Sequence, residues 1–220
     1  MFKRAAWART LPFLVYILFI FIADLLARAG WGAEQLRWLY PLKIGIVLAL
    51  LVLLWPQYTE LHRPRLAPAA ALAALAAGVA VFWLWIHMAD GWMVVGQSAG
   101  YDPRVQGQLA WPLVLVRWLG AALVVPVMEE LFWRSFLMRW LERESFEEVD
   151  PAQLKFKSFI ITVILFGIEH NLWLAGMVAG LVYALLYRRY GTLWAPILSH
   201  AVTNGVLGLW IILTGSWTYW

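Results

Sequence analysis

The sequence predicts an all-α fold, a polytopic integral membrane bundle of about seven transmembrane helices. Of the 220 residues, 63% are hydrophobic and 14% are charged, whereas an average soluble domain is about 45–50% apolar and 25% charged. The apolar runs also extend from one end of the chain to the other, and no long polar block separates them. We therefore expect one membrane-embedded domain over residues 1–220.

The first three predicted spans lie before residue 90. Residues 11–30 follow a basic start, as in a signal peptide, but no A-x-A-like cleavage site follows the long apolar stretch, so we interpret it as a retained helix. Residues 40–55 are somewhat short for a span and are extended by interfacial tyrosine and tryptophan. Residues 66–88 are rich in small side chains, which let neighbouring helices approach closely.

Four further spans are predicted in the second half of the chain. A polar connection over residues 89–110 precedes them, and its Gly, Asp-Pro and Gln residues mark it as a surface loop. The charged segment "ERESFEEVDPAQLKFK" separates the first of these spans from the rest. The four spans cover residues 111–141, 158–174, 175–187 and 192–213.

The distribution of lysine and arginine predicts the orientation of the bundle, because cytoplasmic loops carry an excess of both. With the N-terminus inside, the cytoplasmic segments hold Lys3, Arg4, Arg9, Arg63, Arg65, Arg139, Arg143, Lys155, Lys157, Arg188 and Arg189. The opposite side holds Arg28, Arg37, Lys43, Arg104 and Arg117. This excess predicts a cytoplasmic N-terminus and an external C-terminus. It also accounts for the net charge of +4 by contact with membrane lipids, without a nucleic acid partner.

The stretch "MEELFWR", residues 128–134, places three ionisable side chains in an apolar span. Each charge at a helix centre costs about 2.5–3.5 kcal/mol on insertion scales. Glu130 and Arg134 stand four residues apart on one helical face, so they can pair. Glu129 lies about 100° around the helix from Glu130 and points elsewhere. Pro126, one turn earlier, removes a backbone hydrogen bond and favours a bend.

Two later spans carry polar groups that Glu129 can meet. "FGIEH" places His170 four residues after Phe166, and "SHAVTN" places Asn204 four residues after His200. At a rise of about 1.5 Å per residue, these groups and Glu129 can reach one layer inside the membrane. A carboxylate, two imidazoles and a carboxamide in an apolar bundle form a candidate reaction centre.

These residues resemble three motifs of one family. "EELFWR" fits EExxxR, "FGIEH" fits FxxxH and "HAVTN" fits HxxxN, in the order seen in the CAAX protease and bacteriocin-processing (CPBP) family of intramembrane endopeptidases. The resemblance covers about residues 112–213, which would hold the catalytic helices. The small size and tryptophan-rich helices also resemble a bacterial branch of CAAX prenyl protease-related proteins that is associated with exosortase systems. That branch implies a location in the inner (cytoplasmic) membrane and an exosortase-linked partner.

The resemblance implies peptide-bond hydrolysis of a membrane-associated polypeptide. Carried over, Glu129 would be the general base for the attacking water, assisted by His170. His200 and Asn204 would stabilise the oxyanion of the tetrahedral intermediate, and Glu130 with Arg134 would form a supporting pair. Glu169 matches no motif position, and we expect it either directly behind the catalytic residues or at the rim of the site.

The residues leave the use of a metal open. Glu129, His170 and His200 could serve as a catalytic zinc triad. The H-E-x-x-H pattern is absent, however, and Asn is a poor zinc ligand, so we favour a glutamate protease without a cofactor, with zinc as the alternative. The chain contains no cysteine, which excludes disulfides and thiolate zinc sites.

Other classes of protein also place such groups at mid-membrane. A proton-coupled transporter buries Glu, His and Arg in its spans, but no repeat relates the two halves of this chain, and the polar motifs all lie in the second half. A catalytically silent scaffold or immunity protein and a purely structural polar network are further alternatives. Intact motifs favour the protease.

Overall fold

The computed structural model describes residues 4–62, 66–96, 98 and 100–220, and over these residues the fold is all-α as predicted. Lys3, Arg63 and Arg65, which entered the orientation argument, lie outside the described residues. Five helical stretches are long and apolar enough to cross a membrane, and a shorter apolar helix accompanies them. The main helices are α1 (Arg4–Arg28), α3 (Leu39–Leu53), α4 (Pro68–His87), the continuous helix Trp111–Trp140, α8 (Phe156–Ile168), α9 (Trp173–Tyr190) and α10 (Trp194–Thr214).

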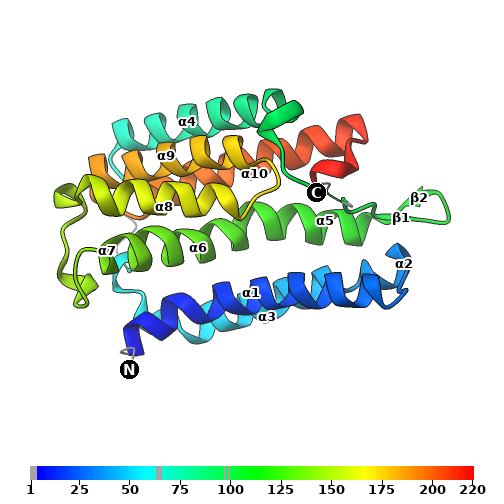
Figure 1. The fold of residues 1–220 in the computed structure, drawn as a ribbon, viewed down its shortest axis with the longest axis horizontal. Helices are drawn as coiled ribbons and strands as arrows, with labels where there is room; N and C mark the ends of the chain where they lie inside the picture. The colour runs from blue at the N-terminus through cyan, green and yellow to red at the C-terminus, as the bar shows by residue number, and fades with distance from the viewer. Residues whose placement is uncertain (1–3, 63–65, 97, 99) are drawn as a thin grey trace.

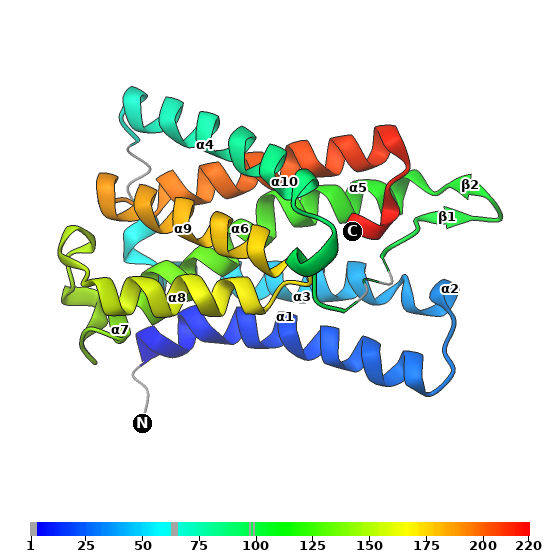
Figure 2. The same cartoon turned by 45° about the horizontal axis from the view of Figure 1, so that its top comes forward.

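The helices form layers on either side of the long central helix (Figure 1). On one side, α1 packs against α3, which the short helix α2 (Ala33–Leu36) precedes. On the other side, α10 packs against α4 and α9, and α8 packs against α9. Figure 2 shows the same arrangement from a second direction. The central helix thus contacts both groups and brings its charged motif to their junction.

The central helix is not a regular α-helix throughout. It consists of α5 (Trp111–Leu119), η4 (Gly120–Val124), α6 (Val125–Glu130), η5 (Leu131–Leu137) and α7 (Met138–Trp140), and η4 and η5 have the wider turns of a π-helix. Such widened turns occur often at functional sites. The motif glutamates end α6, so they lie between two widened segments. The sequence indicated a disturbance here through Pro126 but did not predict two such segments.

The turn between α8 and α9 lies earlier than the sequence suggested. We expected a helix to residue 174 and a new one from 175, but α8 ends at Ile168 and α9 begins at Trp173. The two helices cross closely because neither has a Cβ at the contact: a Cβ on Gly176 would lie 3.1 Å from the Gly167 Cα. Residues 169–172 therefore form a turn that carries His170.

The connection between α4 and α5 contains a small hairpin. Strands β1 (Arg104–Val105) and β2 (Gln108–Leu109) pair antiparallel. Gln106 and Gly107, with φ of 49° and 82°, form the tight two-residue turn, the positive-φ geometry that suits strand twist. Sequence analysis expected a loop without strands here.

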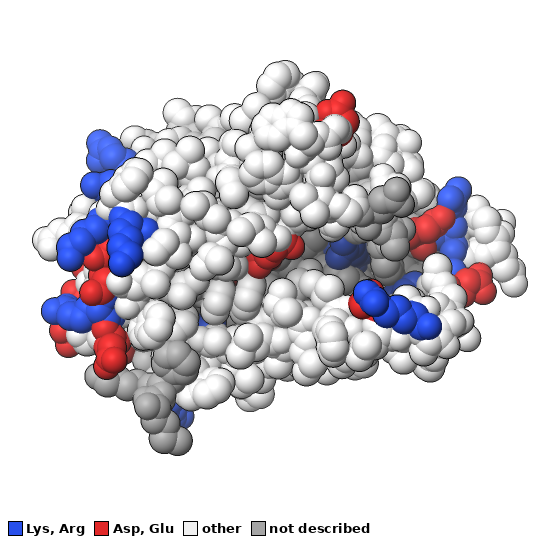
Figure 3. Space-filling model, in the orientation of Figure 1, with Lys and Arg blue, Asp and Glu red and all other residues white. Residues whose placement is uncertain are grey.

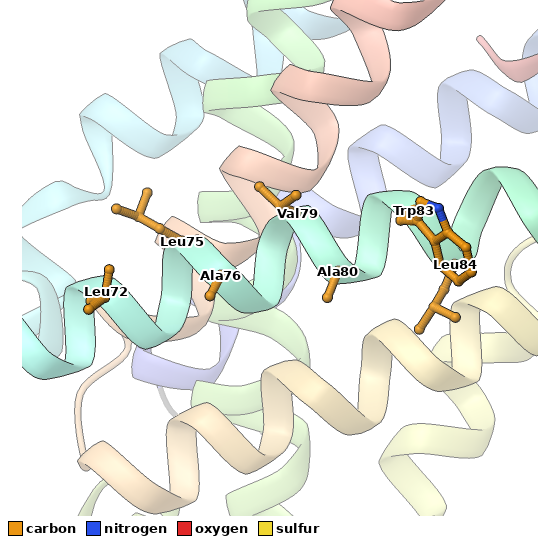
Figure 4. Close-up of a pocket in the computed structure, with 7 residues that line it drawn as sticks. All are labelled: Leu72, Leu75, Ala76, Val79, Ala80, Trp83 and Leu84. Carbon is orange, nitrogen blue, oxygen red and sulfur yellow. The ribbon is translucent and has the colours of Figure 1, made fainter.

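The surface fits a membrane environment. Figure 3 shows charged side chains mainly at the two ends of the molecule and a broad uncharged belt between them. The outer face of α4 in this belt is a shallow apolar groove, drawn in Figure 4. Its lining residues are Leu72, Leu75, Ala76, Val79, Ala80, Trp83 and Leu84. Such a face is suited to lipid tails.

Candidate active site

The Glu130–Arg134 pair lies at the centre of the bundle. Both residues are fully buried, and Arg134 Nη1 donates to Glu130 Oε1 over 3.2 Å. Arg134 Nη2 donates to the Gly180 carbonyl, also over 3.2 Å, and the guanidinium lies 4.4 Å from the centre of the Phe166 ring. The two residues of the pair are one helical turn apart, as the spacing predicts. Phe166 of α8 and Gly180 of α9 contact the Arg134 guanidinium.

Glu130 has a second partner that sequence analysis missed. His200 Nδ1 lies 3.0 Å from Glu130 Oε1. Because a carboxylate only accepts, the ring proton is on Nδ1. The His200 ring also stacks on Tyr183, with ring centres 4.8 Å apart. His200 is therefore fixed in orientation, and its Nε2 is the atom left to face the site.

Glu129 lies on the other side of His200. Its Oε2 is 3.9 Å from His200 Nε2 and is buried without a hydrogen-bond partner among the described residues. This separation exceeds a direct hydrogen bond, but both atoms can contact one small group placed between them. The two adjacent glutamates thus have different environments. Glu130 has two partners on its Oε1, although its Oε2 has none, whereas Glu129 forms no hydrogen bond with any described residue.

His170 approaches Glu129 from the α8–α9 turn. Its Nδ1 donates to the Phe166 carbonyl over 2.7 Å, which is the contact behind the FxxxH spacing. In the neutral ring, Nε2 is then the accepting nitrogen. A Cβ on Gly176 would lie 3.3 Å from the His170 Cβ, so glycine at this position of α9 leaves room for the histidine.

Glu169 contacts the same cluster from its partly exposed edge. One ligand atom each of Glu129, Glu169 and His170 lies within 4.8 Å of the others. Trp133 Nε1 donates to Glu169 Oε1 over 3.1 Å. Trp133 and Glu169 are 36 positions apart in the sequence. No spacing rule predicts a contact between residues of different helices, so sequence analysis did not find this pair.

Asn204 makes a backbone contact on the central helix. Its Nδ2 donates to the Ala121 carbonyl over 2.9 Å. In the widened turn of η4 the bond to this carbonyl would come from residue 126, which is proline and has no N–H. Asn204 therefore supplies the donor that Pro126 lacks. The structure places Asn204 one turn beyond His200 on α10, and the tight cluster consists of Glu129, Glu169, His170 and His200.

The cluster reaches the protein surface at one edge. The side chains of His170 and Glu169 are 25% and 18% exposed, whereas those of His200 and Glu129 are 6% and 9% exposed. The chain after α4 covers this edge, because Val95 N donates to the Asn171 carbonyl and Asn171 Nδ2 donates to the Val95 carbonyl. His170 and Glu169 are therefore the members of the cluster nearest to solvent.

The donor set suits a divalent cation. Two carboxylates and an imidazole within a few ångströms match the ligand chemistry of zinc. The three residues close enough to share one cation are Glu129, Glu169 and His170. Sequence analysis had offered His200 as the third possible ligand, and the structure has Glu169 instead. A cation held there would supply Lewis acidity and lower the pKa of a bound water.

The buried cluster of acids and histidines lies inside a bundle whose helices are long and apolar enough to cross a membrane, an arrangement that suits an intramembrane enzyme. Residues 111–206 match the sequence model of one family, Type II CAAX prenyl endopeptidase Rce1-like. Residues 111–206 are therefore similar to this protease family, which confirms the predicted resemblance. The match covers somewhat less than half of the chain and includes every catalytic candidate. Comparison with curated proteins and with solved structures gave no match.

Proposed function

We propose that the protein is an intramembrane endopeptidase in which Glu129 activates the water that hydrolyses a peptide bond of a membrane-associated polypeptide. The observation that carries this proposal is the free, buried Oε2 of Glu129 beside two oriented imidazoles. A buried acid without a partner is costly. The family match favours the protease over the transporter considered from sequence.

Glu129, His170 and His200 each have a separate role in the proposed hydrolysis. Water lies between the Glu129 carboxylate and His170 Nε2, and Glu129 takes its proton as the oxygen attacks the carbonyl carbon. The carbonyl oxygen becomes negatively charged, and His200 Nε2, when protonated, donates to it. Glu129 then passes the proton to the amide nitrogen as the C–N bond breaks. The products are one carboxylate and one amine.

Other residues hold the two catalytic histidines in their orientation. Glu130 holds His200 through Nδ1 and is itself held by Arg134. Phe166 holds His170 through its carbonyl. Asn204 is assigned to the oxyanion through the second proton of Nδ2, since the first is used on Ala121. Such fixed donors act strongly where water is excluded.

The natural substrate can be identified by comparing membrane proteins in cells. Membrane proteomes of cells that carry the wild-type protein or the Glu129→Ala variant are compared, and a precursor should accumulate in the variant. A precursor from an exosortase-linked system would support the predicted association with such a system. An unchanged proteome, together with no peptide cleavage by the purified protein, would instead support the silent scaffold.

We also infer that the N-terminus is cytoplasmic and the C-terminus external in the inner membrane, on the basis of the basic residues at the N-terminal end of the bundle. The absence of cysteine makes this testable by single-cysteine labelling. A membrane-impermeant maleimide should label Val105→Cys in intact cells and Glu144→Cys only after permeabilisation. The reverse pattern would overturn the orientation.

A further inference from the structure

Two basic side chains, one buried and one partly buried, have no acidic partner among the described residues of the bundle. Lys43 on α3 is only 8% exposed, and Arg117 lies on α5. Within the described part of the chain, neither forms an ion pair, and Arg117 Nε is buried without a hydrogen-bond partner. Charged residues in membrane spans normally pair or serve a function, so both require an explanation.

Tyrosines surround these two cations. Lys43 Nζ lies 3.8 Å from the centre of the Tyr16 ring and 5.0 Å from that of Tyr40. The Arg117 guanidinium lies 4.2 Å from the centre of the Tyr40 ring and 5.6 Å from that of Tyr101. The Tyr101 hydroxyl is also buried, with no hydrogen-bond partner among the residues that the structure describes. Helices α1, α3 and α5 and the loop before α5 therefore build one aromatic, cationic site.

Aromatic faces compensate this charge only in part. A cation over a ring gains less than a buried ion loses in leaving water, and two cations that share the Tyr40 ring also repel each other. Lys43 is close enough to Glu129 for their charges to interact, but the two do not form an ion pair. The site thus has an excess of positive charge and spare donors, which is the chemistry of an anion-binding site.

We propose that Lys43 and Arg117, with the Tyr101 hydroxyl, bind the phosphate of a membrane phospholipid. Lys43 is four residues from the start of α3 and Arg117 six from the start of α5, so they lie about 6 and 9 Å below these helix ends. This is close to the depth of a lipid headgroup layer, about 5–8 Å thick. Figure 3 shows a hollow with basic atoms inside it and an acidic side chain at its edge. This site goes beyond the proposed protease function.

The test measures binding of a short-chain phosphatidylglycerol to the purified full-length protein in detergent by native mass spectrometry. The variants are Lys43→Met and Arg117→Met, and Arg104→Gln is the control because it lies at the same end of the bundle but is exposed and paired with Asp102. Loss of one charge-assisted contact should weaken binding about tenfold. Arg104→Gln should bind as the wild type does.

Conservative variants separate binding from folding. Lys43→Arg and Arg117→Lys keep the charge and should retain most of the affinity, and the lipid should raise the Tm of the wild type but not of the methionine variants. Equal binding by all variants would overturn the site. Displacement of the lipid by millimolar inorganic phosphate would show that the source is the free ion. Displacement by a peptide with a free, but not an amidated, C-terminus would show a polypeptide carboxylate; either result would overturn the lipid assignment.

Discussion

His200 Nδ1 lies 3.0 Å from Glu130 Oε1, although the two residues are 70 positions apart in the sequence. The same carboxylate oxygen accepts from Arg134 Nη1 over 3.2 Å. Glu130 therefore joins the central helix to α10 and orients a histidine of the site. Its neighbour Glu129 forms no hydrogen bond with any described residue, and its buried Oε2 faces His200 Nε2 at 3.9 Å. The two glutamates of the motif should respond differently to the same substitution.

Glu130→Gln should destabilise the protein. It leaves Arg134 as an unpaired charge in the interior, where breaking a buried pair costs about 3–5 kcal/mol. The double variant Glu130→Gln with Arg134→Met should recover part of the lost stability, since no lone charge remains. Because His200 also loses its carboxylate partner, activity should stay low in both. Thermal unfolding and peptide cleavage in detergent measure the two effects. A double variant less stable than the single one would contradict the pairing.

Gly167→Ala should separate α8 from α9. A Cβ at this position would lie 2.8 Å from the Trp173 carbonyl oxygen and closer still to the Met177 side chain. Overpacking of this kind costs about 1–3 kcal/mol, and the shift should move His170 and lower the cleavage rate. Gly45→Ala on α3 is the matched control because nothing lies within 4 Å of its added Cβ. It should keep full activity and gain up to about 1 kcal/mol from helix propensity. Similar effects for both variants would argue against the close crossing.

A salt-bridge network at the N-terminal end of the bundle should make stability acid-sensitive. Arg9 is buried and donates through Nε to Glu60 Oε1 over 2.8 Å and through Nη2 to Oε2 over 2.5 Å, and Ser135 also contacts Glu60. Burial alone would raise the pKa of Glu60, which lies between α3 and α4. The hydrogen bonds and charge of Arg9 and the Ser135 hydroxyl outweigh burial and hold this pKa below its usual value.

The sign of the effect follows from this lowered pKa. The stabilisation is complete above the ordinary glutamate pKa of about 4.3 and is lost as pH falls through the lower folded value. Glu60→Gln should be less stable at neutral pH by about 3–5 kcal/mol, because Arg9 loses its buried partner. Its Tm should also change less with pH below about 5. Parallel Tm curves for the two proteins would exclude Glu60 as the source of acid sensitivity.

Chelation should leave peptide cleavage unchanged, since the proposed mechanism uses Glu129 as the base without a metal. The purified protein is dialysed against EDTA, and cleavage and metal content are measured together. Glu169→Gln removes one of the three residues that could hold a cation and should retain activity. Loss of cleavage on chelation, with recovery on adding Zn²⁺, would show that Glu129, Glu169 and His170 hold a catalytic metal.

The sequence predicted most of the helices because membrane spans leave a strong signal. Long apolar runs mark each span, and costly polar residues inside them stand out. Glu129, His170 and His200 could be selected as site candidates for this reason. The predicted boundary between α8 and α9 was wrong because the chain is apolar on both sides of the turn, and the close approach of Gly167 and Gly176 is a contact between helices that the sequence does not show.

Contacts between distant helices could not be predicted in the same way. The bonds from His200 to Glu130 and from Trp133 to Glu169 depend on how α10 and α8 pack against the central helix. Spacing rules apply within one helix, as for Glu130 and Arg134. The role of Asn204 toward Ala121 likewise depends on the widened turn before Pro126, which a single sequence does not show.

The most direct test of the central claim is hydrolysis in water enriched in ¹⁸O. Purified wild-type protein and Glu129→Gln are reconstituted in liposomes with a peptide library, and products are analysed by mass spectrometry. Glu129→Gln keeps nearly the same side-chain volume and removes only the base. We expect the wild type to release peptides with one ¹⁸O at each new carboxyl terminus, and the folded variant to release none. Cleavage by a folded Glu129→Gln protein, or products without ¹⁸O, would contradict the assignment of Glu129 as the residue that activates water.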